Sequence, residues 1–214
     1  MKARPVKGLE PDGALAENAA RIVCVRLEEL RAFAPKALQP HRSRAQHDMR
    51  IAAKRLRYVL EATEFCLGRP AQTARRRARD LQDLLGELHD CDVMLPRIHR
   101  HLEALEHADA RAVRDRAGDS RDLDPRLAAR ARHRASYRGL EVLAVYVRAR
   151  RALLFDRFRE FWAEQERIAT WDRLERAMER IIGEARERRR AEKRASQGDS
   201  RPREPRRLTP AGRE

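Results

Sequence analysis

The stretch "HDMRIAAKRLRY", residues 47–58, carries the pattern from which the fold of this chain can be predicted. Its apolar residues recur every three or four positions, which is the spacing of an amphipathic helix. At 100° per residue, most of the positive side chains fall within one stripe roughly 80° wide, and the apolar side chains lie opposite. The stripe contains His47, Arg50, Lys54 and Arg57, joined by Tyr58 and Glu61, whereas Arg55 points away from it. We therefore predict a two-sided helix, with one face for a core and one that is strongly positive.

Three interpretations of this positive stripe remain open from the pattern alone: a solvated outer face, a surface that binds an anion, or a face that pairs with acidic residues of the same chain. Like charges three or four residues apart repel by a few tenths of a kcal/mol per pair, and a solvated face usually mixes both signs. Neighbours on the stripe are about 5–6 Å apart, a spacing at which successive phosphates can be met.

The same periodicity in the rest of the chain predicts an all-α protein, a bundle of about five to six helices. Ser43 and Gln46 form a candidate capping box for the helix that contains the stripe, and Gly68 with Pro70 supplies its end. Pro96 is expected to separate two further helices. Residues 107–124 are predicted to be a loop or a frayed helix end. The expected helices cover residues 14–38, 43–67, 71–95, 96–106, 125–167 and 171–194.

Composition along the chain predicts four parts. Residues 1–12 are expected to be a flexible leader and residues 13–168 the helical bundle. Residues 169–194 are expected to form a basic C-terminal helix. The last part, residues 195–214, is rich in Pro, Gly and charge without an apolar face, which is typical of a disordered tail.

The charge balance points to an acidic partner. The formal net charge is +15, with 39% charged and only 5% aromatic residues. Nucleic acid, polyphosphate, an anionic membrane or an acidic protein would all suit such a surplus. No apolar run approaches the roughly 20 residues of a membrane-spanning helix, and no secretory signal is recognisable, so we expect a cytoplasmic protein without membrane insertion. The three cysteines show no metal-ligand spacing, and we predict neither a metal site nor a cofactor.

A second cationic helix follows the first. Arg75, Arg79 and Gln82 share one side of the predicted helix 71–95, and Gly86 falls on that side. A glycine inside a helix costs about 1 kcal/mol relative to alanine, so Gly86 is expected to allow the close approach of a helix or a ligand. His89 and Asp90 flank the same side.

On the later long helix, Arg134 and Arg148 share a flank, whereas Arg151 lies among apolar positions and must snorkel, pair with an acid or bind a ligand.

The order of these motifs resembles the CHAD family of all-helical domains. The residues that carry the resemblance are "HDMRIAAKRLRYVLEATEFCLG" followed by "ARDLQDLLGELHDCDVML". The resemblance implies non-catalytic binding of inorganic polyphosphate by basic side chains. The implied binding residues are His47, Arg50, Lys54, Arg57, Arg75, Arg79, Arg134, Arg148 and Arg151, supported by Tyr58, Gly86, His89 and Asp90. Family members usually contain two such halves and only one is visible here. The chain therefore resembles either a half-size member, which could pair as a homodimer, or a member whose second half has diverged.

Two other function classes are alternatives to polyphosphate binding: a nucleic-acid-binding protein and an enzyme. A nucleic-acid-binding or architectural protein fits the charge, although aromatic residues for base stacking are scarce. An enzyme such as a polyphosphatase is disfavoured because the sequence contains no Walker loop, HExxH motif or nucleophile elbow. We therefore expect a polyphosphate-binding protein that is not an enzyme, located in the cytoplasm or at polyphosphate granules, with nucleic acid as the second choice.

Overall fold

A computed structural model describes residues 2–198 of the chain, and in that part it contains six helices and no strand. The helices are α1 (Leu15–Ala37), α2 (Ser43–Leu67), α3 (Arg69–Ala117), α4 (Pro125–Ala129), α5 (Arg134–Arg167) and α6 (Thr170–Gly198). The predicted all-α class is confirmed. No helix of the described residues is both long enough and apolar enough to cross a bilayer.

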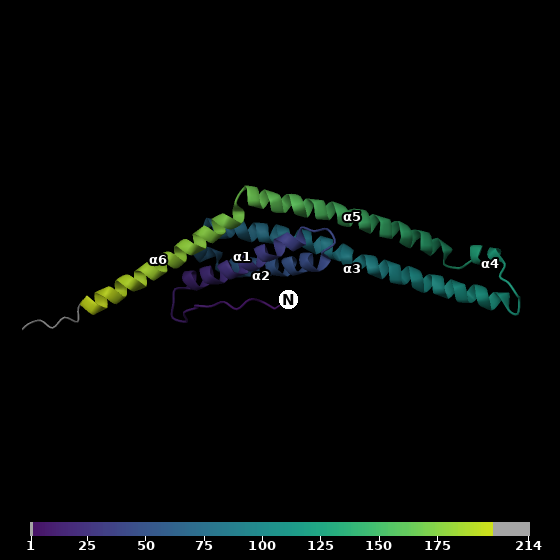
Figure 1. Cartoon of the computed structure of the whole chain (residues 1–214), viewed down its shortest axis with the longest axis horizontal. Helices are drawn as coiled ribbons and strands as arrows, with labels where there is room; N and C mark the ends of the chain where they lie inside the picture. Colours follow the sequence, from purple (N-terminus) through teal and green to yellow (C-terminus); the bar gives the residue numbers. More distant parts are fainter. Residues whose placement is uncertain (1, 199–214) are drawn as a thin grey trace, which may run out of the picture.

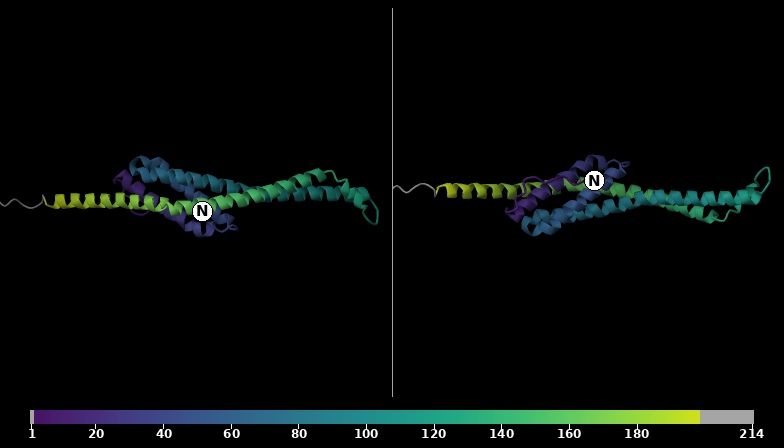
Figure 2. Two further views of the ribbon diagram at one scale, coloured as in Figure 1. Left: turned by 90° about the horizontal axis from the view of Figure 1, so that it is seen from above. Right: turned by 90° about the horizontal axis from the view of Figure 1, so that it is seen from below.

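The helices form a body and a long arm (Figures 1 and 2). The body consists of α1, α2 and the first part of α3, covered by the end of α5 and the start of α6. Beyond it, α3 and α5 run antiparallel to the far end of the molecule, where α4 lies. The predicted tail falls partly outside the described residues, since the structure describes nothing beyond residue 198.

The core of the body is built from the apolar faces that the periodicity predicts. On α2 the side chains of Met49, Ala53, Leu56 and Leu60 are fully buried. They pack in one cluster with residues of the other helices, which include Leu27, Leu30, Leu81, Leu85, Leu88, Phe158 and Leu174. A single residue, Gly68, joins α2 to α3, and its φ of 79° lies in the left-handed region that favours glycine. This tight turn fixes the antiparallel register of α2 and α3.

The third helix is longer than predicted. Instead of ending before Pro96, α3 continues to Ala117. Residues 96–106 are helical as predicted but belong to α3 rather than to a separate helix, and the predicted loop or frayed helix end at 107–124 is wrong for residues 107–117. A proline inside a helix removes one backbone hydrogen bond. Here the packing of α3 against α5 sustains the helix past that point, because Ile98 and Asp109 beyond the proline are both buried.

The predicted helix 125–167 is interrupted at the end of the arm. Its first turn is the separate α4, and α5 begins only at Arg134. The break is held by Asp109 of α3, whose carboxylate accepts a hydrogen bond from the backbone N–H of His133 at 3.0 Å and from the hydroxyl of Tyr137. The Tyr137 hydrogen bond, with that of His133, lowers the pKa of Asp109, and burial together with that carboxylate raises the pKa of Tyr137 to about 12.

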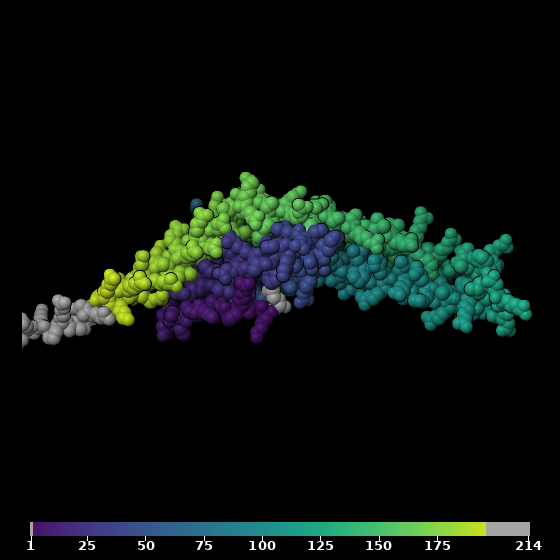
Figure 3. Space-filling model, viewed as in Figure 1, coloured from purple at the N-terminus to yellow at the C-terminus, as the bar shows by residue number. Residues whose placement is uncertain are grey.

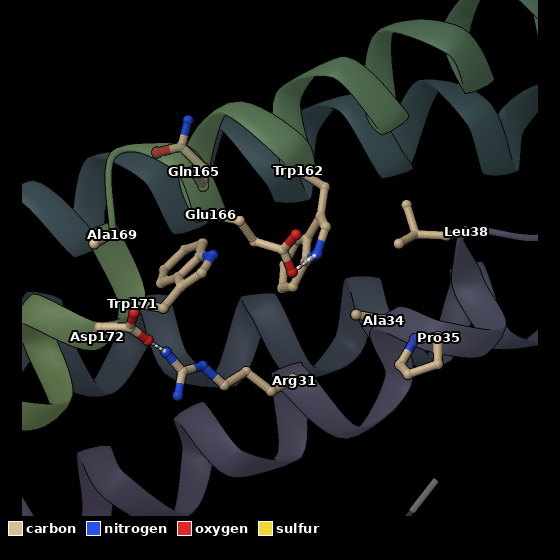
Figure 4. Close-up of a pocket in the computed structure, with 10 residues that line it drawn as sticks. All are labelled: Arg31, Ala34, Pro35, Leu38, Trp162, Gln165, Glu166, Ala169, Trp171 and Asp172. Carbon is tan, nitrogen blue, oxygen red and sulfur yellow. Dashed lines mark hydrogen bonds and ion pairs between the residues drawn. The ribbon is translucent and has the colours of Figure 1, made fainter.

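A pair of stacked tryptophans lies at the turn from α5 to α6 (Figure 4). The rings of Trp162 and Trp171 are 6.0 Å apart between centroids, and they border a pocket of about 390 Å³ together with Arg31 of α1. The indole N–H of Trp162 donates to Glu166 at 2.7 Å, and Arg31 pairs with Asp172. These contacts fix the angle at which α6 leaves α5 and returns across α1.

A buried carboxylate fastens α6 to α1. Glu17 is 2% exposed and accepts hydrogen bonds at 2.6 Å from both terminal nitrogens of Arg189, and one at 2.7 Å from Arg21. These hydrogen bonds, first that of Arg189, lower the pKa of Glu17 from 4.5 to about 2. The ionised carboxylate therefore stabilises the folded chain.

The buried carboxylate of Glu17 predicts that the stability of the fold decreases at acid pH. Because the pKa of Glu17 is lowered in the folded state, its contribution to the unfolding free energy is complete above pH 4.5 and is lost as the pH falls towards 2. A Glu17→Gln variant is expected to lose about 2 kcal/mol of unfolding free energy at neutral pH and to show a flatter acid limb. Urea unfolding at a series of pH values measures both. Glu28→Gln is the control, since Glu28 is 61% exposed and its pair with Arg4 is a surface contact worth less than about 1 kcal/mol. Equal effects of the two variants would contradict the assignment.

Candidate functional site

The positive stripe of α2 faces α3 rather than open solvent alone. The imidazole rings of His47 and His89 lie 4.6 Å apart between centroids. One turn further along α2, Arg50 lies against Gly86, where a Cβ would come 3.4 Å from its Nε atom. Gly86 therefore leaves room for the arginine side chain to lie across α3. The two contacts place four of the sequence-predicted site residues together.

The same register sets the remaining pairs of this face. Because α2 and α3 are antiparallel, His47 opposite His89 and Arg50 opposite Gly86 place Lys54 opposite Gln82 and Arg57 opposite Arg79. We call the resulting surface the α2–α3 cationic face. It consists of His47, Arg50, Lys54 and Arg57 on α2, with Arg79, Gln82, Gly86 and His89 on α3.

Polar atoms without hydrogen-bond partners are concentrated on this face. Within the described chain, the buried side-chain atoms that lack a partner include His47 Nδ1, Arg50 Nε, Arg57 Nε and Gln82 Oε1. Leaving a buried donor or acceptor unpaired costs about 1–3 kcal/mol, more for a charged group. Two of these atoms belong to guanidinium groups, which are suited to binding phosphate oxygens. An anion bound here would accept hydrogen bonds from the two guanidinium groups, whereas Gln82 Oε1 is itself an acceptor and needs a donor.

Tyr58 holds the outer part of the stripe in place. Its ring lies 4.4 Å from the guanidinium carbon of Arg57 and 5.6 Å from the ammonium of Lys54. Cation–π contacts of this kind order the long side chains without neutralising their charge. The side chain of Arg57 is only 19% exposed, and its nearest carboxylate oxygen, on Glu61, is 4.0 Å away. Both cations thus keep a charge that can act on a ligand.

Two of the predicted α3 arginines differ in how free they are. Arg75 donates from Nε to Glu64 of α2 at 2.5 Å, so it serves to join the two helices. Arg79 is 65% exposed, and its Nε atom is 3.7 Å from Asp83 in the same helix, a loose surface pair. Asp90 is also exposed on α3. Of the two arginines, Arg79 is the one available to a ligand.

The predicted arginines of α5, which are Arg134, Arg148 and Arg151, do not form part of the α2–α3 cationic face. Arg151 donates to Asp92 of α3 at 2.5 Å and to Gln46 of α2 at 3.1 Å, which is the acid pairing that the sequence left open. Gln46 also donates to the carbonyl oxygens of residues 37 and 39, so the predicted capping box does not form. Arg134 donates to the carbonyl oxygen of residue 129 at the far end of the arm, where it caps α4.

A second region with several basic side chains lies beside α5, and the sequence indicated only Arg148 and Arg151 of it. A surface pocket of about 760 Å³ is bordered by Arg148, Arg151, Arg159 and His41, with Asp92 and Asp156 also in its lining. Arg148 also contacts the ring of His99 at 2.8 Å. The contributions of His41 and Arg159 arise from chain segments over a hundred residues apart, and no spacing in the sequence relates them.

The environment of His47 favours the neutral ring. Burial is the main cause that lowers its pKa below 6.5, and the neighbouring His89 adds to it, while Asp48 acts in the opposite direction. Burial thus holds the pKa of His47 below the usual value of a histidine in the free protein. An anion bound beside the ring would favour protonation and reverse this shift.

Comparison with known families identifies the part of the chain that contains this face. Residues 3–99 match the CHAD domain, which covers α1, α2 and α3 as far as residue 99. No curated protein and no solved structure matches the chain. In the described residues no group of His, Cys, Asp or Glu side chains is arranged to hold a metal ion. The resemblance noted in the sequence is confirmed for residues 3–99, which match the CHAD domain and contain the whole of the α2–α3 cationic face.

Proposed function

We propose that the protein binds inorganic polyphosphate on the α2–α3 cationic face and does not itself catalyse a reaction. CHAD domains are associated with polyphosphate binding in general. The observation that carries the assignment to this face is that Arg50 and Arg57 present buried, unpaired Nε atoms on the same side of α2. A linear polyanion would run along α2, since its phosphates would meet a cation at each turn.

The residues divide the work between contact and support. The residues that would contact phosphate oxygens are Arg50, Lys54, Arg57 and Arg79. Gly86, which has no side chain, lies directly against the side chain of Arg50. Tyr58 orders the side chains of Arg57 and Lys54. Arg75 and Arg151 would act indirectly, because their carboxylate partners hold α2, α3 and α5 together. Arg148 with the adjacent pocket would extend the path towards α5. Association with polyphosphate granules in the cytoplasm would follow from such binding.

Competition binding tests the choice of ligand. Labelled long-chain polyphosphate is bound at near-physiological salt and challenged with duplex DNA, RNA and tripolyphosphate. The proposal predicts that long-chain polyphosphate competes far better than nucleic acid at equal phosphate concentration, because the ring of Tyr58 already packs against Arg57 and Lys54 and is poorly placed to stack on bases. Equal competition by all polyanions would instead favour a nonspecific nucleic-acid-binding protein.

His47 predicts a pH dependence of this binding. The pKa of His47 lies below 6.5 in the free protein, and a nearby phosphate would raise it. Binding therefore takes up a proton, and the affinity is expected to rise as the pH falls through the bound-state pKa. The increase stops once the pH is below the free-state pKa. In His47→Gln this increase should be reduced, whereas His101→Gln, a change at an exposed histidine of the arm, should retain it. Identical pH profiles for wild type and His47→Gln would remove His47 from the site.

A further inference from the structure

The outer face of α5 carries an apolar stripe that no other described helix covers. The inner face of α5 is already buried through Ala144, Val147, Leu154 and Phe158. On the opposite side Val142 and Val145 are each 63% exposed, Tyr146 is 60% exposed and Leu153 is 53% exposed. In Figures 1 and 3, α5 forms the upper edge of the molecule, with no segment above it. A helix that is apolar on two opposite faces is typical of one that packs on both sides.

The stripe has oppositely charged ends at equal distances from its centre. Ala149 lies at the middle of the stripe, and Arg138 and Glu160 are each eleven residues away along the helix, one before it and one after. At 100° per residue all three fall on the same side of α5, and each charge is about 16 Å from the alanine. Asp156 precedes Glu160 by one turn and reinforces the negative end. Arg138, Asp156 and Glu160 are all exposed.

This order of charges is self-complementary only in an antiparallel pair. A two-fold axis through Ala149 places Arg138 of one copy opposite Asp156 and Glu160 of the other, twice over. The same axis brings Val145 opposite Leu153, and the small side chain of Ala149 allows the two helices to approach at the centre. On the flank, Glu141 of one copy comes close to Arg159 of the other. A parallel pair would set Arg138 against Arg138 and Glu160 against Glu160.

We propose that the outer face of α5 binds a second copy of this chain, giving an antiparallel homodimer with its axis at Ala149. Because the contact is isologous, each complementary pair occurs twice. The two arms then form a four-helix bundle in which each apolar stripe is covered by the other. This proposal uses no residue of the α2–α3 cationic face and does not depend on what that face binds.

Sedimentation velocity over a micromolar concentration series, without polyanion, tests the pairing. The wild type is expected to shift from monomer to dimer as its concentration rises. Val145→Lys places two charges in the apolar centre of each dimer and is expected to raise the dissociation constant about 100-fold. Phe65→Lys is the control, because Phe65 is 75% exposed on α2, away from the stripe, and should leave the dimer intact. Circular dichroism on each variant confirms that the helices are retained.

Charge reversal tests the antiparallel register itself. Arg138→Glu alone and Glu160→Arg alone each set like charges against one another at both ends, so each should weaken the dimer. The double variant Arg138→Glu/Glu160→Arg exchanges the charges of this pair and should restore much of the lost pairing, the remainder being lost because Asp156 keeps its negative charge. These differences should shrink at high salt. A parallel dimer would respond to neither single change in this way.

Four results would overturn the proposal. They are a wild type that stays monomeric at high micromolar concentration, a dimer that Val145→Lys leaves unchanged, a dimer lost in Phe65→Lys, and a double reversal that fails to restore pairing. A monomer that binds anionic vesicles through Val145 would assign the stripe to a membrane surface instead. Polyphosphate binding measured on Val145→Lys keeps the two conclusions apart, because a monomeric variant should retain its α2–α3 cationic face.

Discussion

Long-chain polyphosphate is expected to bind about 100-fold more weakly when Arg50 and Arg57 are both replaced by glutamine. Each guanidinium would donate charge-assisted hydrogen bonds to phosphate oxygens, and one such contact is worth about 1.5–3 kcal/mol. Their Nε atoms have no partner in the described chain, and the ion pair of Arg57 with Glu61 is a long one of 4.0 Å, so both Nε–H groups can donate to a ligand. Glutamine keeps part of the length and polarity but removes the charge. Isothermal titration calorimetry at fixed salt measures the loss.

A charge-matched control separates the face from the overall charge. Arg114→Gln/Arg116→Gln removes the same two charges from exposed positions near the end of α3, outside the face. This variant should bind within about threefold of wild type, because long-range attraction between exposed charges is screened beyond roughly 10 Å at such salt. If both double variants lose affinity equally, net charge rather than the α2–α3 cationic face determines binding.

Gly86 offers a way to abolish binding without weakening the fold. A Cβ at this position would lie 3.4 Å from Arg50 Nε, which is ordinary van der Waals contact. Gly86→Ala should therefore raise the unfolding free energy by about 0.5–1 kcal/mol through helix propensity and keep most of the affinity. Gly86→Glu should also form a stable helix, but its carboxylate would neutralise Arg50 and repel phosphate. We expect about a 100-fold loss of polyphosphate affinity.

The matched control for this change is Gly183→Glu on α6. Gly183 has open space around the position of a Cβ, so the same substitution adds the same negative charge away from Arg50. Polyphosphate affinity should change little, and thermal unfolding should show no loss of stability in any of the three variants. If Gly86→Glu bound polyphosphate like Gly183→Glu, Arg50 would not contact the ligand.

The sequence predicts the local features of α2 well because they depend on residues one or two turns apart. The apolar positions of residues 47–60 determine both the buried side of α2 and the opposite positive stripe. The partner of a charged side chain is harder to predict, since it comes from another helix. Arg151 pairs with Asp92, 59 positions earlier in the chain, and Arg75 with Glu64 across the turn at Gly68.

The errors in the helix boundaries have a common physical cause. Local propensity places a helix end at Pro96 and a continuous helix across residue 133, whereas packing between α3 and α5 decides otherwise at both positions. The carboxylate of Asp109 accepts a hydrogen bond from the backbone N–H of His133. A residue in the predicted loop 107–124 therefore determines where α5 begins. The contact between His47 and His89 could be anticipated only once the register of α2 and α3 was known.

The most direct test of the central claim is an NMR titration of the arginine side chains with long-chain polyphosphate. Resonances of Arg50 and Arg57 Nε–H are assigned from single Arg→Lys variants, and Arg114 and Arg116 serve as internal references. Binding at the α2–α3 cationic face predicts that the Arg50 and Arg57 signals shift together and saturate at the binding stoichiometry, while the two references stay in place. Shifts confined to arginines outside the α2–α3 cationic face, with Arg50 and Arg57 unchanged at saturation, would contradict it.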